Sequence, residues 1–369
     1  MINFSKYLQS KKRFSSLKLK NKKLNKDVSK IFEKIVKKKI DFTKIKDLKK
    51  LTIEDIKKID NEVRNKYQKT FVKLIKPEIK SILKVFFDNE NLNIRVGCQS
   101  KYRWEADFKK KKYLNIHYKD YKKGLKETLS DDLLLKPTPA HQDLSNNGFR
   151  SSSVLIFYFQ ITPISKFSSL LSVGTFKNKV GIFPSFINKD NYANVIKDKY
   201  LNNIKFKVSK ELKPDSMFIM DSMTPHRSSM VAKFPRLALN VKIQPTSLNY
   251  LYRINEIKKS FTKKNSIEER LSFLEKDLIK LAKKNNSLFY ELAILNFINK
   301  DYTKMKKNLK KMLLFKPSNK IINTFIAGGL FRKAVEQVNS NDLKKIKAKK
   351  YQIVKNSCAH AILNTLKLD

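Results

Sequence analysis

Residues 213–243 read KPDSMFIMDSMTPHRSSMVAKFPRLALNVKI, and this stretch favours two strands that flank a histidine. The first candidate strand is SMFIMD and the second is RLALNVKI, because both runs are short, apolar and bounded by turn-forming residues. Pro225 breaks the chain immediately before His226, and Arg236 begins the second run. The pattern therefore predicts a histidine beside a strand, ten residues ahead of an arginine.

The same texture extends over residues 71–250, where short β-rich runs are separated by Pro, Asn and Asp. Further candidate strands are NIRVGCQ, YLNIHY, SVLIFYFQI, LLSVGTF, VGIFPSF and IKFKV. Many short strands after a helical prelude predict a barrel or a double-sheet jelly roll. With helical segments on both sides of this region, the expected fold class is α+β.

Residues 1–70 form the first of these flanking segments, a Lys-rich region that we expect to be helical. The segments VSKIFEKIVKKKI and LTIEDIKKIDNEV have apolar residues at helical spacing, and Thr52 is a plausible N-cap for the second helix.

Residues 251–369 form the second flanking region, which is also expected to be helical. Within SIEERLSFLEKDLIKLAKK, Ser266 and Glu269 match a capping box. A later segment resembles one tetratricopeptide repeat, although an ordinary helical hairpin explains it equally well. The residues at the packing and terminal positions of that repeat are Phe289, Leu292, Ala293, Tyr302, Met305, Leu309, Met312 and Pro317.

The composition is strongly basic, with 81 Lys and Arg against 33 Asp and Glu and a net charge of +48 at pH 7. Clustered basic residues attract phosphate, so a nucleic-acid partner is one interpretation of this charge. The basic residues include only 10 Arg, however, and the Lys residues are spread along the whole chain. An A+T-rich coding sequence produces the same bias, and we prefer that interpretation.

The cysteine content and the lengths of the apolar runs indicate in which cellular compartment the protein is expected. Cys98 and Cys358 are too few and too far apart in the chain for a disulfide framework. The first residues, MINFSKYLQSKKRF, contain no apolar core of signal-peptide length, and the longest apolar stretch, VLIFYF, is strand-sized. We therefore expect a cytoplasmic protein without a membrane span.

A second motif, TPAHQDLSNN at residues 138–147, sets His141 two residues before Asp143. In an extended segment these two side chains point to the same face, because strand side chains alternate with period two. One imidazole nitrogen and one carboxylate oxygen can then reach a single metal ion. A pair of structural residues is the simpler alternative for this motif taken alone.

A third ligand must come from one of the other histidines. His360 lies in a predicted C-terminal helix and is most simply a packing residue, whereas His117 alternates with apolar neighbours as either a core or a pocket residue. His226 has the most informative surroundings, because it follows a strand and a proline and precedes Arg236. The joint pattern of H-x-D, distal His and Arg favours a metal site.

Two histidines and one carboxylate form the facial triad of non-haem Fe(II) oxygenases, which leaves coordination positions open for a cosubstrate and dioxygen. If the cosubstrate is 2-oxoglutarate, its distal carboxylate needs a fixed cation. Arginine suits this task because its planar guanidinium donates two parallel hydrogen bonds to a carboxylate and stays charged. Arg236 is therefore the candidate, in a chain where Lys outnumbers Arg about sevenfold.

These motifs resemble the Fe(II)- and 2-oxoglutarate-dependent dioxygenases, and among them the phytanoyl-CoA dioxygenase-like family. The resemblance covers residues 75–245 and rests on PAHQDLSNNG, SSSVLIFYFQI and the stretch from 213 to 243. It implies a double-stranded β-helix, a cupin-like jelly roll whose mouth holds iron. By this resemblance the iron ligands are His141, Asp143 and His226, Arg236 binds 2-oxoglutarate, and Ser228 lies beside that carboxylate.

The chain departs from this family at KPDS, where Pro214 and Asp215 replace the glycine that commonly precedes the distal-histidine strand. A Pro-Asp pair also makes a turn, so the strand is still expected. Asp143 fills the carboxylate position that related halogenases leave empty. The resemblance thus implies hydroxylation of a C–H bond in a small-molecule substrate, with release of succinate and CO2.

Two other functions stay open, and the substrate is undefined. The basic charge suggests a nucleic-acid demethylase of the same iron class, but Lys242 stands where that branch has a second arginine. The other alternative is a non-enzymatic helical scaffold around an inert barrel, whose C-terminal helices bind a protein partner. The candidate pocket residues are Arg103, Trp104 and Arg150; the arginines suit an anionic substrate, and packing positions explain all three as simply.

Overall fold

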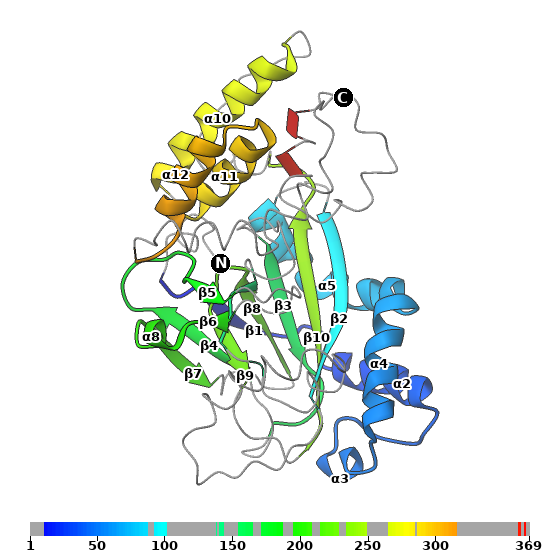
Figure 1. Ribbon diagram of the computed structural model, residues 1–369. Coiled ribbons are helices and arrows are strands. Elements are labelled where there is room, and N and C mark those ends of the chain that lie inside the picture. The colour runs from blue at the N-terminus through cyan, green and yellow to red at the C-terminus, as the bar shows by residue number, and fades with distance from the viewer. Residues whose placement is uncertain are drawn as a thin grey trace.

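The computed structural model combines helices with antiparallel sheets (Figure 1). This confirms the mixture of helices and antiparallel strands expected from the sequence. The residues that it describes are 11–87, 92–101, 138, 140–143, 154–164, 171–186, 195–208, 215–228, 234–248, 265–284, 286–315, 361–362 and 365–366.

A five-stranded antiparallel sheet, in the order β1-β8-β3-β10-β2, forms the centre of the structure (Figure 1). Three neighbouring strands in its middle correspond to the predicted runs SVLIFYFQI, SMFIMD and RLALNVKI. The five strands are β1 (Phe14–Lys18), β8 (Ser216–Asp221), β3 (Leu155–Gln160), β10 (Arg236–Pro245) and β2 (Leu92–Lys101).

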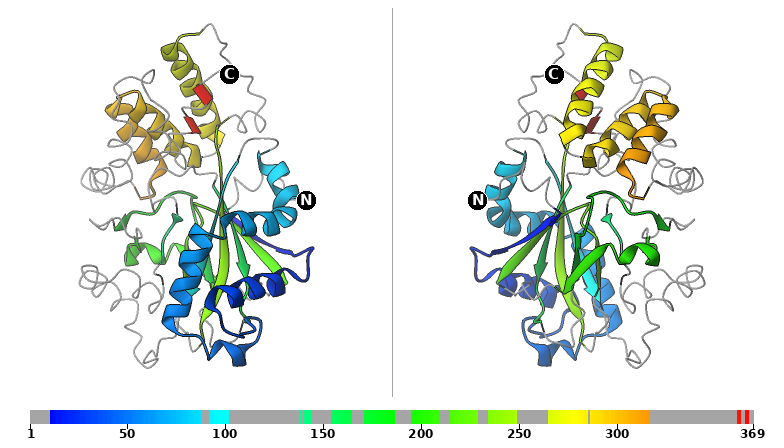
Figure 2. Two further views of the ribbon diagram at one scale, coloured as in Figure 1. Left: turned by 90° about the vertical axis from the view of Figure 1, so that its right-hand side faces the viewer. Right: turned by 90° about the vertical axis from the view of Figure 1, so that its left-hand side faces the viewer.

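β3 is buried on both faces, because helices cover one side of the sheet and a second group of strands covers the other (Figure 2). Phe157 belongs to the core beneath the helices, whereas its neighbours Ile156 and Tyr158 pack in the core shared with Val173 of the second group. Alternate side chains therefore enter different cores. This explains why residues 155–159 are aliphatic or aromatic at every position instead of alternating with polar residues.

The second group of strands contains a three-stranded sheet, β7-β4-β9, and the pair β5-β6. His141 connects the two, because it forms isolated bridges with both His226 of β9 and Val195 of β6. The short helix α8 (Asp198–Leu201) leads into β7. The strands are β4 (Leu171–Phe176), β5 (Ser185–Phe186), β6 (Val195–Ile196), β7 (Ile204–Val208) and β9 (His226–Ser228).

The N-terminal helices are α2 (Leu24–Val36), α3 (Ile45–Leu48), α4 (Ile53–Asn65) and α5 (Gln68–Phe87). Thr52 caps α4 as predicted, since its side chain accepts a hydrogen bond from the backbone of Asp55. Two details differ from the expected helical region. The segment FSSLK forms β1, whose pairing with β8 overrides its Lys-rich context, and α5 continues past residue 70 because its buried face persists through Pro77.

The C-terminal helices are α10 (Ile267–Lys284), α11 (Phe289–Ile298) and α12 (Tyr302–Met312), with the 3-10 turn η4 (Asn286–Leu288) between the first two. The capping box is confirmed, because Ser266 and Glu269 exchange hydrogen bonds of 2.7 and 3.1 Å between side chains and backbone amides. Residues 316–360, which include Pro317, lie outside the described residues. None of the helices described has both the length and the apolar character needed to span a membrane.

Gly174 of β4 lets the segment before β9 approach closely. Its amide donates a 2.7 Å hydrogen bond to the carbonyl of Pro225, the residue before His226. A Cβ atom at this position would lie 2.4 Å from Ile204 Cγ2 and 3.1 Å from the Pro225 carbonyl oxygen. The absence of a side chain at Gly174 thus sets the separation between β4 and the His226 segment.

Gly174→Ala should therefore lower the free energy of unfolding by about 1–3 kcal/mol, the usual effect of forced overpacking. Gly97→Ala is the matched control, because a Cβ atom there meets only the Asn240 oxygen at 3.9 Å. Urea denaturation of both variants tests this expectation. Equal stabilities of the two variants would contradict the close approach at Gly174.

Candidate metal centre

Three buried residues, His141, Asp143 and His226, come together between the two groups of strands, although His226 is far from the other two in the sequence. His226 begins β9, and His141 lies beside it through paired backbone hydrogen bonds of 3.0 and 2.9 Å. Asp143 follows His141 by two residues, and all three side chains are buried. The structure thus brings together the three metal ligands proposed from the sequence.

The three side chains place one ligand atom each around a common point. Asp143 Oδ1 lies 3.6 Å from His141 Nε2 and 3.8 Å from His226 Nε2, and the three ligand atoms fall within 4.8 Å of one another. Ligand bonds to a divalent metal are about 2.0–2.2 Å long, so adjacent ligands at right angles are separated by roughly 3 Å. The two separations that involve Asp143 Oδ1 exceed this value by less than about 1 Å, so a modest contraction would bring Asp143 and each histidine to bonding distance of one ion.

His226 is held in the tautomer that a metal requires. Its Nδ1 lies 3.0 Å from the carbonyl oxygen of Thr224, and because a carbonyl only accepts, Nδ1 carries the proton. The lone pair is then on Nε2, which is buried and has no hydrogen-bond partner within the described part of the chain. Buried polar atoms are rarely left unsatisfied, and a metal ion at the cluster would satisfy this one.

The electrostatic surroundings keep His226 neutral. Burial is the largest cause that lowers the pKa of His226 to about 3; His141 acts in the same direction, and Asp143 opposes both. A neutral imidazole is the form that binds metals, whereas a protonated one repels them.

The two carboxylate oxygens of Asp143 contact different partners. Oδ2 lies 2.5 Å from Lys242 Nζ of β10, and Oδ1 faces the two histidines. The ammonium group therefore favours a carboxylate that offers one oxygen to an ion. In the sequence, Lys242 is notable only as a missing arginine, because nothing local links it to a residue 99 positions away.

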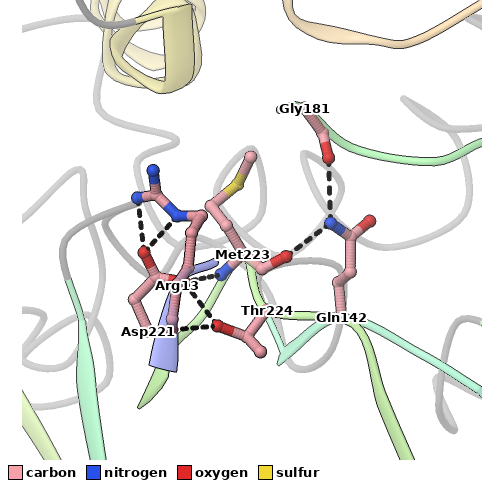
Figure 3. A network of polar contacts seen from close by, with 6 residues as sticks. All are labelled: Arg13, Gln142, Gly181, Asp221, Met223 and Thr224. Carbon is pink, nitrogen blue, oxygen red and sulfur yellow. Dashed lines mark hydrogen bonds and ion pairs between the residues drawn. The ribbon is translucent and has the colours of Figure 1, made fainter. Parts of the chain in front are cut away.

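Gln142, between the two proximal ligands, anchors the motif. Its amide nitrogen donates to the carbonyls of Gly181 and Met223 at 2.9 and 2.7 Å (Figure 3). Its oxygen accepts from the Phe183 amide at 2.9 Å. The side chain is 1% exposed. Sequence reasoning missed this role, although alternation in a strand already directs the middle residue of H-x-D away from its neighbours.

Arg236, the residue proposed for 2-oxoglutarate, is buried at the start of β10, only 2% exposed. Its guanidinium carbon lies 5.9 Å from the ring centroid of Tyr158. Strand periodicity puts Arg236 on the same face of β10 as Ala238 and Lys242, and Ala238 packs in the core between the two groups of strands. Arg236 therefore faces the interior that also contains the His–Asp–His cluster.

Of the remaining residues proposed from the sequence, the structure describes Ser228 but none of the three proposed substrate residues. Ser228 is buried on β9, two residues beyond His226, and its amide donates to the Thr138 carbonyl at 3.0 Å. The proposed substrate residues Arg103, Trp104 and Arg150 lie outside the described residues.

No protein-family model matches the chain, and no curated protein matches it. Solved structures that are similar include EvdO2 from Micromonospora carbonacea var. aurantiaca, with a TM-score of 0.33 and 17% identity over 49% of this chain and 65% of that chain. The chain thus spans less than two thirds of EvdO2. EctD from S. alaskensis with 2-oxoglutarate and 5-hydroxyectoine has a TM-score of 0.38 and 11% identity, over 64% of this chain and 73% of that chain.

The epimerase SnoN, in complex with Fe3+, alpha ketoglutarate and nogalamycin RO, has a TM-score of 0.39 and 8% identity, over 72% of this chain and 92% of that chain. These TM-scores are all below 0.5.

A divalent ion should stabilise the folded protein through the His–Asp–His cluster. Co(II) at about 100 times its dissociation constant should raise the free energy of unfolding by about 2.7 kcal/mol. His226→Ala should abolish this increment, whereas Asp55→Asn, which alters a buried carboxylate of α4, should retain it. Urea denaturation with and without Co(II) measures the effect, and an undiminished increment in His226→Ala would place the ion elsewhere.

The metal-free protein should lose stability as the pH falls below about 6.5, the ordinary pKa of histidine. In this range the unfolded chain binds a proton at His226 that the folded state excludes until about pH 3. By linkage this residue shifts the unfolding equilibrium up to tenfold per pH unit toward the unfolded state. Denaturation in chelator at several pH values should show a shallower slope for His226→Gln; identical slopes would contradict a buried neutral imidazole.

Proposed function

We propose that this protein is a non-haem Fe(II)- and 2-oxoglutarate-dependent dioxygenase that hydroxylates a C–H bond of a small molecule, with release of succinate and CO2. The observation that carries this proposal is the buried cluster of His141, Asp143 and His226. In it a neutral His226 imidazole presents to a carboxylate oxygen an Nε2 that has no hydrogen-bond partner among the described residues. Two histidines and one carboxylate suit Fe(II) and leave positions open for cosubstrate and oxygen.

The two facing groups of antiparallel strands support a double-stranded β-helix of the phytanoyl-CoA dioxygenase-like type. The resemblance implies that the mouth of such a barrel holds the iron. The His–Asp–His cluster lies where β9 meets the segment of residues 140–143, and β10 contributes Lys242 from the large sheet. Both sheets thus supply residues to one site.

Arg236 is the proposed anchor for the distal carboxylate of 2-oxoglutarate. A buried guanidinium favours a carboxylate partner strongly, because desolvation weakens competition from water and the planar fork donates two parallel bonds. Ser228 is the proposed hydroxyl donor beside it. The Tyr158 ring lies against the guanidinium and restricts its orientation.

The residues of the chain have positioning roles in this reaction. Bound Fe(II), with 2-oxoglutarate and dioxygen, supplies the oxidising chemistry. His226 and His141 hold their imidazoles toward the ion, Asp143 contributes one negative charge, and Lys242 fixes the carboxylate rotamer. Burial of all three ligands excludes bulk water and protects the reaction from side products.

We further propose an anionic small-molecule substrate and a cytoplasmic location. The candidate residues Arg103 and Arg150 support an anion. We propose separately that the C-terminal helices, of which α11 and α12 pack against each other, bind a protein partner.

Anaerobic addition of 2-oxoglutarate to the Fe(II)-loaded protein should produce the weak visible charge-transfer band of a keto acid chelated to triad-bound iron. His141→Ala should abolish the band. Arg236→Ala should need about 10- to 150-fold more 2-oxoglutarate, the effect of losing a charged hydrogen bond worth about 1.5–3 kcal/mol. Absorption titrations of the three proteins measure these differences.

Arg227→Ala is the matched control for Arg236, because the Arg227 guanidinium packs over the Phe206 ring at 4.2 Å on the other face of β9. This control should titrate like the wild type. Folded wild-type protein that binds one Fe(II) yet gives no band at saturating 2-oxoglutarate would contradict the proposed cosubstrate. A wild-type titration curve for Arg236→Ala would contradict the role of that arginine alone.

A further inference from the structure

The turn between β8 and β9 determines how His226 is presented. Asp221 ends β8, and its Oδ1 accepts a 3.0 Å hydrogen bond from the Met223 amide. The Thr224 amide donates to the Asp221 carbonyl at 3.1 Å, which closes the turn. The Thr224 carbonyl then accepts the Nδ1 proton of His226. Because this carbonyl fixes both the tautomer and the ring plane, a displacement of the turn moves the metal-facing Nε2.

The turn is held in place by a buried residue from the N-terminal segment. Arg13 and Asp221 are both essentially inaccessible to solvent, and Arg13 Nε donates to Asp221 Oδ2 at 2.5 Å (Figure 3). The Nη2 group of Arg13 pairs with the same oxygen. The two carboxylate oxygens are therefore divided, with Oδ2 bound to Arg13 and Oδ1 bound to the turn.

Thr224 connects the same two partners a second time. Its hydroxyl lies 2.7 Å from the Arg13 carbonyl oxygen and 2.9 Å from Asp221 Oδ1. A hydroxyl has one proton, so it donates to one of these oxygens at a time. Whichever oxygen accepts this proton, the Thr224 side chain is bonded to the Arg13–Asp221 pair. The Thr224 backbone carbonyl accepts the hydrogen bond from His226 Nδ1.

The edge strand β1 delivers Arg13 to this position. β1 pairs with β8 in a register that sets Phe14 opposite Met220, so Arg13 arrives beside Asp221, 208 residues away in the chain. The pairing of β1 with β8 is formed by backbone groups, so it does not itself require an arginine at position 13. A buried ion pair is often no more stabilising than apolar residues of similar volume, but loss of one partner leaves an uncompensated charge. The pair is therefore better suited to fixing one geometry than to adding stability.

We propose that Arg13 is a positioning residue of the metal centre, acting through Asp221 and Thr224 to orient His226. This inference rests on the proposed function only in that the cluster binds a metal ion. The N-terminal strand β1 thereby becomes part of the site, although it contributes no ligand. Outer residues that orient a metal-binding histidine typically change metal affinity by 10- to 100-fold when they are substituted.

Co(II) binding to the full chain tests this role, because its affinity and its visible d–d spectrum respond to ligand geometry. Arg13→Gln should weaken Co(II) binding by about 10-fold or more and alter the spectrum, and Arg13→Lys should recover part of both. Glu78→Gln is the matched control. Glu78 is 3% exposed and accepts hydrogen bonds from the amides of Lys20 and Asn21 at 2.7 and 2.9 Å, so it anchors the same N-terminal segment away from the turn.

Glu78→Gln should lower the stability of the protein and leave Co(II) affinity and spectrum unchanged. Wild-type Co(II) binding in Arg13→Gln would overturn the positioning role, and so would an equal loss of affinity in both variants. If Arg13→Gln does not fold, Thr224→Val carries the test, because it removes the hydroxyl and keeps the carbonyl. It should weaken Co(II) binding several-fold, and an unchanged affinity would overturn the proposal.

Failure of the positioning role and failure of the proposed function give different results. Co(II) binding that depends on both His226 and Arg13, without any 2-oxoglutarate band on Fe(II), refutes the function and retains the positioning role. A normal 2-oxoglutarate band with Co(II) binding indifferent to Arg13 refutes only the positioning role.

Discussion

The candidate site depends on the reciprocal backbone hydrogen bonds between His141 and His226. Residues that exchange both bonds across antiparallel strands project their side chains to the same face at close range. This pairing brings two histidines, 85 positions apart, to a ring separation of 4.1 Å. Asp143 reaches the same point because it follows His141 by two residues. A two-stranded contact thus converts two separate sequence motifs into one set of three ligand atoms.

Burial of this set is unfavourable without compensation, and the surrounding residues supply it. Lys242 balances the charge of Asp143, the Thr224 carbonyl accepts the proton of His226, and Gln142 joins the H-x-D segment to two neighbouring loops. Within the described residues, His226 Nε2 is buried without a hydrogen-bond partner, and it points at the place where an ion would bind. A Lewis acid at the cluster would satisfy this atom.

Local pattern was sufficient to predict the central strands and to single out the two motifs that contain the candidate ligands, because each strand and each motif depends on residues near one another in the chain. SMFIMD and RLALNVKI are strands in the structure, and His141, Asp143 and His226 converge. Contacts set by sheet register could not be predicted. Lys242 meets Asp143 through the position of β10, and Arg13 meets Asp221 through the pairing of an edge strand hidden in a Lys-rich segment. α5 crosses the boundary drawn at residue 70, because its buried face continues to Phe87.

The central claim is that one iron ion binds between these three side chains. Crystals grown anaerobically with Fe(II), with diffraction data collected on both sides of the iron absorption edge, would locate the ion without any assumption about substrate or activity. The account predicts a single anomalous peak within bonding distance of His141 Nε2, His226 Nε2 and Asp143 Oδ1, with Lys242 still on Asp143 Oδ2. A peak elsewhere, or an empty cluster in protein saturated with Fe(II), would contradict it.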